Sequence, residues 1–265
     1  MLLAAGFSWF HLIPGVADDT LLPSMFGFEG SHETHVLVAA WFSCAVVLFG
    51  AILARLGLER AKKRNGIEKY FADDTLTIRN GAEVFVSGIR GMMSDLLEPK
   101  DVRLFLVAIG GMFIYILISN LMGLVPGFLP PTDKMTHNAA IALTSFFLFM
   151  GVGLSRDPVG FIKHLMGPVA LLVPLIFAIE ALGMVLRPVT LSFRLSGNMF
   201  GDHAVFGVMS EIMMSIHPTI GMFIPVPALF LGLGLVVSFI QAFVFSLLST
   251  IYIGLSVPHH DHDDH

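Results

Sequence analysis

Charged residues are scarce in this sequence. Of its 265 residues, 13% are charged and 55% are hydrophobic, whereas a soluble domain carries about 25% charged residues. The polar surface is too small to cover a water-soluble globule, so the apolar excess has to face lipid. The composition therefore excludes a soluble protein and predicts an all-α, polytopic membrane protein, for which we expect no nucleic-acid partner.

The sequence also has only one cysteine, no signal-peptide features and no internal repeat. The single cysteine, Cys44, excludes an internal disulfide, and its apolar neighbours indicate a packing role. The opening MLLAAGFSWFHLIPG is short and has no basic region and no obvious cleavage site, so we expect a mature amino terminus near the membrane surface and not a removed signal peptide. Residues 1–34 form the expected amino-terminal segment, which the distribution of basic residues places outside. No internal repeat is apparent, although inverted-repeat transporters usually have paired broken helices in two halves of the chain.

What the sequence does contain is a series of long apolar runs. A helix needs about 20 apolar residues to cross a bilayer, and such runs recur throughout one stretch that we expect to form a single membrane domain, residues 35–256. Four of them predict one crossing each: residues 35–56, 102–125, 138–154 and 228–255.

A fifth apolar run, residues 168–216, is longer than one perpendicular helix requires. As a helix it would measure on the order of 70 Å, against a hydrocarbon core of about 30 Å. It forms either two crossings or one long, broken and strongly tilted helix. In the second case the chain has about five crossings and ends in a tilted helical hairpin over about 168–256.

Residues 75–100 have a different pattern, because charged residues interrupt the apolar ones. The apolar residues recur at roughly helical spacing, which predicts an amphipathic helix lying in the cytoplasmic interface. An ordinary helix in a cytoplasmic loop is the alternative. The apolar positions concerned are Val84, Val86, Ile89, Met92, Leu96 and Leu97.

The distribution of basic residues predicts the orientation. Ten of the 15 Lys and Arg residues lie between Arg55 and Arg103, two more are Arg156 and Lys163, and only Lys134 falls in a loop assigned to the outside. By the positive-inside rule the amino terminus is then outside. With five crossings the carboxyl terminus is cytoplasmic, whereas a sixth crossing would put it outside. The acidic, histidine-rich tail (257–265) has no Lys or Arg, so the positive-inside rule does not decide between these two locations.

Ionisable residues gather in one apolar segment, residues 180–203, where such groups are costly unless paired or hydrated. Glu180, Arg187 and Arg194 are spaced by seven, so they lie nearly on one helix face. Asn198 continues that face, whereas His203, nine residues after Arg194, points to the opposite side. One helix therefore presents a fixed cation to one neighbour and a titratable group to another.

Each of these residues also has a simpler interpretation. Arg187 could be a structural partner of Glu180, and Asp202 could be a turn or surface acid. Arg194 has no acidic residue three or four positions away, so no local partner neutralises it. A partner on another subunit, or an aqueous cavity, is the favoured interpretation for Arg194.

The run PVTLSFRLSGNM, residues 188–199, resembles the signature of F-type ATP synthase subunit a, the membrane stator and ion-channel subunit. The family's essential arginine falls on Arg194 and its helix asparagine on Asn198. The last apolar run resembles the family's final helix, whose glutamine falls on Gln241, and Glu180 matches an acidic position. The resemblance covers roughly residues 35–256 and includes the outward loop PPTD.

The resemblance implies a proton-translocating stator subunit of a bacterial inner membrane, with no catalysis of its own and no cofactor. It implies as partners the rotor ring of subunit c, the peripheral-stalk subunit b, the soluble catalytic sector and the lipid bilayer. Many family members pair an acid and a histidine at the positions of His203 and Gly234, so the half-channel pairing is incomplete here. Asp202, Glu211 or water would substitute, and Glu180, Asn198 and Gln241 complete the expected polar lining.

Two other classes of membrane protein fit part of this sequence. A secondary ion-coupled transporter fits the composition but would need a small-molecule cavity and usually two related halves. A haem subunit would use His203 and His217, yet the last crossing has no partner histidine. The tail residues His259 to His265 could bind a divalent metal, but a solvated tail is the simpler interpretation, and we assign no metal site.

Overall fold

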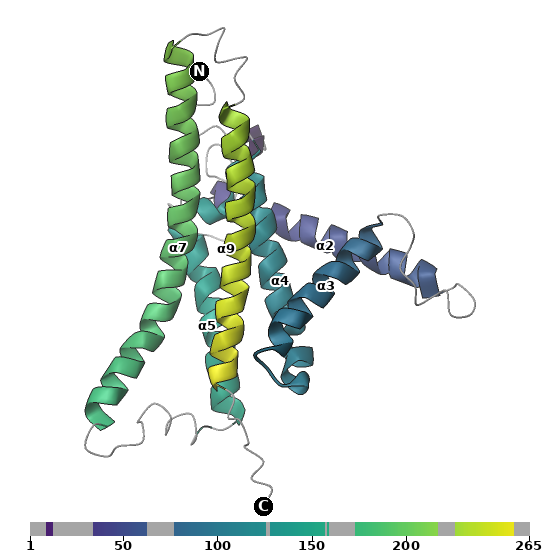
Figure 1. Ribbon diagram of the computed structural model, residues 1–265, viewed down its shortest axis with the longest axis vertical. Coiled ribbons are helices and arrows are strands. Elements are labelled where there is room, and N and C mark those ends of the chain that lie inside the picture. The colour runs from purple at the N-terminus through teal and green to yellow at the C-terminus, as the bar shows by residue number, and fades with distance from the viewer. Residues whose placement is uncertain are drawn as a thin grey trace, which may run out of the picture. The chain divides into compact units, whose positions relative to one another are not determined.

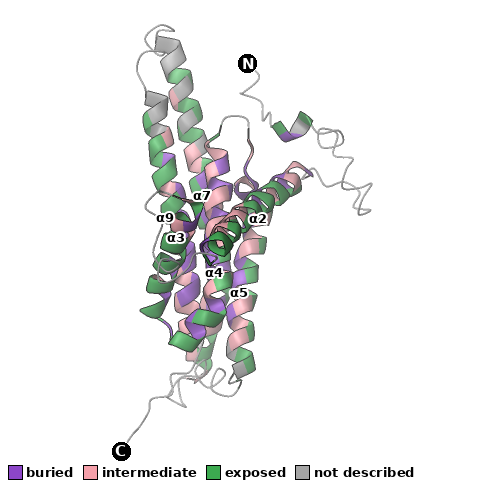
Figure 2. Ribbon diagram, turned by 90° about the vertical axis from the view of Figure 1, so that its right-hand side faces the viewer, coloured by how far each residue is buried: buried purple, intermediate pink, exposed green. Residues whose placement is uncertain are grey.

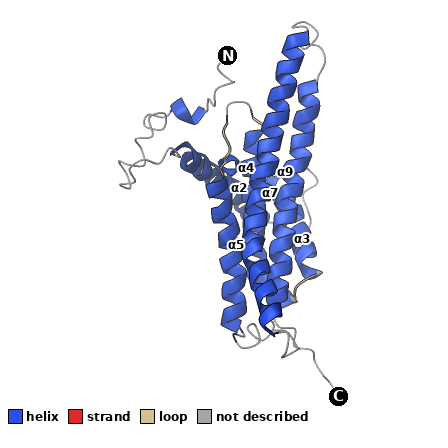
Figure 3. Cartoon of the chain, turned by 90° about the vertical axis from the view of Figure 1, so that its left-hand side faces the viewer, coloured by secondary structure: helices blue, strands red, loops and turns tan. Residues whose placement is uncertain are grey.

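The computed structural model describes residues 9–12, 34–62, 77–125, 128–156, 158, 173–216 and 226–256. Within these ranges the chain is helical, with short turns and without strands (Figure 3). A short 3-10 helix, η1 (Trp9–Leu12), is the described part of the predicted amino-terminal segment. The tail 257–265 and His217 lie outside the described residues.

Five of the described helices are long and apolar enough to cross a membrane (Figure 1). The predicted all-α, polytopic fold with about five crossings is therefore confirmed. These helices are α2 (Thr34–Lys62), α4 (Pro99–Gly123), α5 (Met135–Arg156), α7 (Val173–Ile216) and α9 (Val226–Ser256).

The long apolar run forms one helix and not two. Helix α7 has 44 residues and continues through an internal proline, Pro188. At 1.5 Å per residue it is about 66 Å long, twice the thickness of a hydrocarbon core. Of the two alternatives the single helix is correct, and it is continuous where we expected it to be broken.

The helices group into two compact units. The first contains η1, α2, α3 (Ile78–Ser94), α4 and residues 238–242 of α9. The second contains α5, α7 and the remainder of α9.

In the first unit, α2 packs against α3, α4 and η1. The ring of Phe10 lies 5.7 Å from that of Phe42 and 5.5 Å from that of Phe128, so an aromatic cluster holds η1 on α2. On α4, Phe113 contacts Phe85 of α3 and Phe239 of α9, with ring centroids 5.4 and 5.8 Å apart. Aromatic packing therefore forms two groups in this unit, one that joins η1 to α2 and one that joins α3, α4 and α9.

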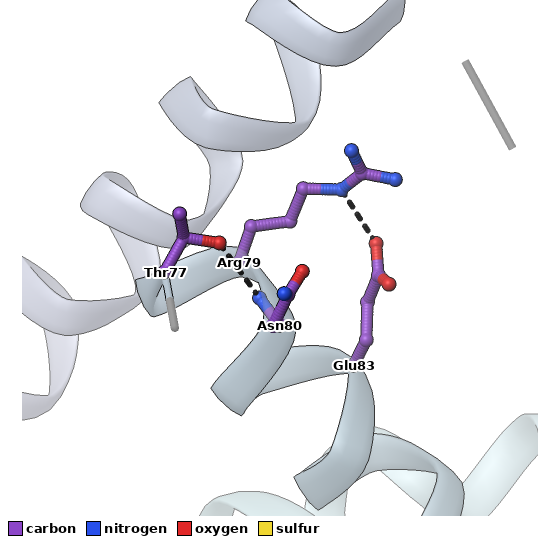
Figure 4. A network of polar contacts seen from close by, with 4 residues as sticks. All are labelled: Thr77, Arg79, Asn80 and Glu83. Atoms are coloured by element: carbon purple, nitrogen blue, oxygen red, sulfur yellow. Dashed lines mark hydrogen bonds and ion pairs between the residues drawn. The ribbon is translucent and has the colours of Figure 1, made fainter. Parts of the chain in front are cut away.

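Helix α3 begins with a polar cap (Figure 4). The hydroxyl of Thr77 accepts a hydrogen bond from the backbone N–H of Asn80 at 3.3 Å, which satisfies one of the free amides of the first turn. One turn on, Nε of Arg79 donates to Oε1 of Glu83 at 2.7 Å. The Arg79 side chain is only 5% exposed because α2 lies over it. The two helices are close at this point: a Cβ added to Gly57 of α2 would be 3.3 Å from the Cβ of Arg79.

The predicted amphipathic helix is shorter than expected at its carboxyl end. Helix α3 stops at Ser94, and α4 begins at Pro99, before the predicted start at 102. Proline favours the first turn of a helix, where its missing N–H costs nothing, so the boundary falls at Pro99. Ile89 and Met93 are buried whereas Ser87 and Arg90 are exposed, so α3 has a buried apolar side and an exposed polar side, although the exposed side also carries Val84 and Val86.

In the second unit, α5 packs along α7 and contacts α9. The hydroxyls of Ser145 on α5 and Ser249 on α9 are 2.8 Å apart and buried. The ring of Phe149 lies 5.7 Å from that of Tyr252. Many large apolar residues of the helices are exposed, among them Phe147 and Phe200. Exposed residues, green in Figure 2, occur along all the long helices. Such surfaces are unfavourable in water, which agrees with a lipid environment.

Candidate functional site

The candidate site is built on the middle of α7, around Pro188. Proline has no N–H, so one backbone hydrogen bond of the helix is missing there. Neighbouring hydroxyls bond to nearby carbonyls: Thr190 donates to Leu186 at 2.9 Å, and Ser192 donates to Pro188 at 2.7 Å. Serine and threonine commonly supply such bonds in membrane helices interrupted by proline. Neither bond reaches the Met184 carbonyl, which the proline leaves without its usual donor, and α7 is nevertheless continuous through this position.

One face of α7 is buried and another is exposed. The buried positions recur every three or four residues, as expected for one helix face, and α5 packs along this helix. Arg194 and Asn198, four residues apart, lie on the exposed face. The buried positions are Met184, Pro188, Leu191, Ser192, Leu195 and Met199.

Asn138 connects α5 to this part of α7. Its Nδ2 group donates to the carbonyl of Thr132 at 2.7 Å and to the hydroxyl of Ser196 at 2.8 Å. The side chain is fully buried. Our sequence analysis did not select this asparagine; the signal that could have found it is a polar amide at the start of an apolar helix.

Arg187 forms the ion pair that its spacing from Glu180 allows. Its Nη2 lies 3.4 Å from Oε1 of Glu180, and the side chains are 22% and 35% exposed. The Arg187 guanidinium also lies 4.6 Å from the ring centroid of Tyr252 on α9. Tyr252 was not among the predicted residues, because its part in the site depends on how α9 packs.

Arg194 has a different environment. Its side chain is exposed, and among the described residues it forms no ion pair. Asn198 is exposed on the same face, Asp202 is half-buried, and Glu211 is exposed near the end of α7. His203 lies on α7, but its side chain is outside the described residues. The structure therefore places Arg194 and Asn198 on one surface.

Gln241 lies on α9 in the segment that packs with the first unit, and it is 4% exposed. Gly234, seven residues earlier, is also buried. That Gln241 and Arg194 act together stays a prediction. Within the described part of the chain, no three metal-ligating side chains are grouped.

The fold and this surface define a class: a polytopic helical membrane protein with a fixed cation exposed on a membrane-length helix. The model of one protein family, ATP synthase A chain, matches residues 37–254. The chain belongs to this family. It is thus a membrane-embedded protein of the ATP synthase a-subunit type.

Three relatives illustrate the similarity. ATP synthase subunit a of Bdellovibrio bacteriovorus is 32% identical over 97% of this chain and 99% of its own length. ATP synthase subunit a of Sorangium cellulosum is 36% identical over 77% of this chain and 76% of its own length. ATP synthase subunit a 2 of Syntrophotalea carbinolica is 42% identical over 66% of this chain and 71% of its own length.

Proposed function

We propose that this chain is the proton-translocating stator subunit of a rotary ATP synthase and that Arg194 is its fixed cation. The observation that carries the proposal is an exposed arginine in the middle of a membrane-length helix, with no ion pair among the described residues. A charge at membrane depth is costly unless it is paired or hydrated. Arg194 is therefore placed for a partner or an aqueous path outside this chain.

The role of Arg194 is electrostatic. A guanidinium stays protonated in proteins, so it does not relay protons by titration. If the rotor ring carries a membrane-buried carboxylate, a cation at about 4 Å stabilises the ionised acid by about 4 kcal/mol at an effective dielectric of 20. That energy favours the ionised form about a thousandfold. The ring site loses its proton near Arg194, and the same charge blocks a direct leak between two half-channels.

Space next to Arg194 supports a close approach of the ring. A Cβ added to Gly197 or Gly201 would meet no atom of the chain within 4 Å. Small residues let helices pack closely in lipid. In this proposal Asn198 and Gln241 hydrate or orient Arg194.

The remaining polar residues of α7 form the lining of the half-channels. These residues are Glu180, Asp202, His203 and Glu211. Glu180 contributes as the ion-paired partner of Arg187. His203 sits nine positions beyond Arg194 and so on another side of α7.

The proposal extends to assembly and orientation. Residues 35–256 act as one membrane domain whose hairpin of α7 and α9 is tilted and faces the ring of subunit c. Amphipathic α3 lies in the cytoplasmic interface, and the peripheral stalk, with subunit b, and the soluble catalytic sector complete the complex. The chain resides in a bacterial inner membrane, amino terminus outside and carboxyl terminus inside. It catalyses no reaction alone; ATP chemistry belongs to the soluble sector.

The test is ATP-driven proton pumping in inverted vesicles that carry the assembled complex. Arg194→Ala is compared with the parent at equal content of the ring and the stalk. We expect the variant to lose coupled pumping. Normal pumping by the assembled variant would reject the stator role and favour a secondary ion-coupled transporter.

A further inference from the structure

The amide of Asn138 joins two parts of the second unit that are far apart in sequence. Both of its hydrogen bonds start from Nδ2: one goes to the Thr132 carbonyl just before α5, the other to the Ser196 hydroxyl on α7. The asparagine is 0% exposed. Its Nδ2 group is therefore fixed by two hydrogen bonds, while its buried Oδ1 atom has no hydrogen-bond partner among the described residues.

Ser196 follows Arg194 by two positions on α7. Two residues turn an α-helix by about 200°, so the two side chains leave the helix on nearly opposite sides. Leu195 and Met199 are buried beside Ser196, while Arg194 is exposed. Turning α7 by one residue, about 100°, would move Arg194 out of its exposed position.

Apolar contacts alone do not hold that rotation firmly. The hydrophobic effect is non-directional, and in lipid one apolar helix face is nearly as well solvated as another. A hydrogen bond to one hydroxyl is directional, and its loss would leave a buried N–H of Asn138 without an acceptor. The Asn138–Ser196 bond is therefore suited to select one rotational setting.

We propose that Asn138 is a positioning residue for Arg194. Through Ser196 it holds α7 in the rotational setting that turns Arg194 away from α5 and toward the rotor. This inference rests on the stator role proposed above for Arg194.

The chain offers a matched control for the hydroxyl. Ser192 lies one turn before Ser196 on the buried face of α7, but its hydroxyl donates within its own helix, to Pro188. Ser196→Ala and Ser192→Ala each remove one hydroxyl from the same helix. Ser196→Thr keeps the hydroxyl.

The first readout is the number of protons pumped per ATP hydrolysed by the assembled complex. An ordinary hydrogen bond shifts an equilibrium by about threefold to tenfold, so Ser196→Ala and Asn138→Ala should shift α7 away from the favoured setting by about that factor and lower the pumping ratio below that of the parent. The double variant should be no worse than the more severe single one. Ser192→Ala and Ser196→Thr should keep the parental ratio. A loss of assembled protein without a change of ratio would overturn the proposal.

The second readout reports rotation without using Arg194. Leu195→Cys, in a chain with Cys44→Ser, places a thiol at a position that is 1% exposed. Adding Ser196→Ala should raise its rate of reaction with a small membrane-permeant thiol reagent by about threefold to tenfold, whereas Ser192→Ala should not. An unchanged rate overturns the positioning role. Two results separate this inference from the stator proposal. If Arg194→Ala pumps normally while Ser196→Ala still raises the reaction rate of the thiol introduced by Leu195→Cys, the stator proposal fails, but the Asn138–Ser196 bond still sets the rotation of α7.

Discussion

The guanidinium of Arg187 lies 4.6 Å from the ring centroid of Tyr252, so α7 and α9 are joined by a cation–π contact at the residue before Pro188. The same guanidinium pairs with Glu180. Arg194, one heptad further along α7, has neither kind of contact among the described residues. Two arginines of one helix thus lie in different surroundings: Arg187 is paired and packed against α9, whereas Arg194 is exposed.

We expect the contact of Arg187 with Tyr252 to contribute to stability. Arg187→Met and Tyr252→Leu should each lower the free energy of unfolding in mixed detergent micelles, and their effects should not add. A partly exposed cation–π contact is worth about 0.5–2 kcal/mol, which is the expected coupling energy. Tyr252→Phe keeps the ring and should cost less than Tyr252→Leu. Additive effects of the two substitutions would show that the contact does not stabilise the fold.

The contact between α5 and α9 can be tested by a cross-link. Since the hydroxyls of Ser145 and Ser249 are 2.8 Å apart, Ser145→Cys with Ser249→Cys should form a disulfide under mild oxidation in a chain with Cys44→Ser. The measurement is the loss of two free thiols. Thr144→Cys with Ser249→Cys is the control, because Thr144 is exposed and the next residue points about 100° away. Equal cross-linking of both pairs would contradict the assigned face of α5.

The close approach of α2 to α3 predicts different outcomes for two glycines of α2. Gly57→Ala would put a Cβ 3.3 Å from that of buried Arg79, whereas Gly50→Ala meets nothing within 4 Å. Alanine is favoured over glycine in a helix by about 1 kcal/mol, so Gly50→Ala should be neutral or stabilising. Gly57→Ala should be less stable than Gly50→Ala. Equal midpoints of denaturation in detergent would show that α3 does not pack on Gly57.

The polar cap of α3 should contribute measurably to the free energy of unfolding. Thr77→Ala removes the hydroxyl that accepts from the amide of Asn80 and should cost about 1 kcal/mol. Thr77→Ser keeps the acceptor and should stay close to the parent. If both variants unfold at the same denaturant concentration, the cap contributes nothing.

Much of the fold could be predicted because apolar length and charge are local properties. The runs that predicted α2, α4, α5 and α9 need only be long and uncharged, and they match the helix bounds within three residues, except that α2 ends six residues later than predicted. The continuity of α7 could not be predicted as surely. Proline usually kinks or interrupts a helix, and nothing in the local sequence indicates that α7 continues through Pro188.

The candidate site was predictable where it depends on position along one helix. The spacing of seven places Arg187 near Glu180, and the ion pair is formed. Tyr252 and Asn138 were missed because their contacts join segments 65 and 58 residues apart, and their identity depends on how the helices pack. The roles of Arg194, Asn198, Gln241, Asp202, His203 and Glu211 stay predictions.

The two arginines of α7 give the most direct test of the central claim. Arg194→Gln and Arg187→Gln remove the same charge from one helix, seven residues apart, and the measurement is protons pumped per ATP hydrolysed in vesicles with equal amounts of assembled complex. The stator role predicts that Arg194→Gln abolishes coupled pumping. It predicts that Arg187→Gln lowers the yield of the complex but keeps the parental ratio in what is assembled. A parental ratio for Arg194→Gln, or equal loss in both variants, would contradict the assignment of Arg194 as the fixed cation.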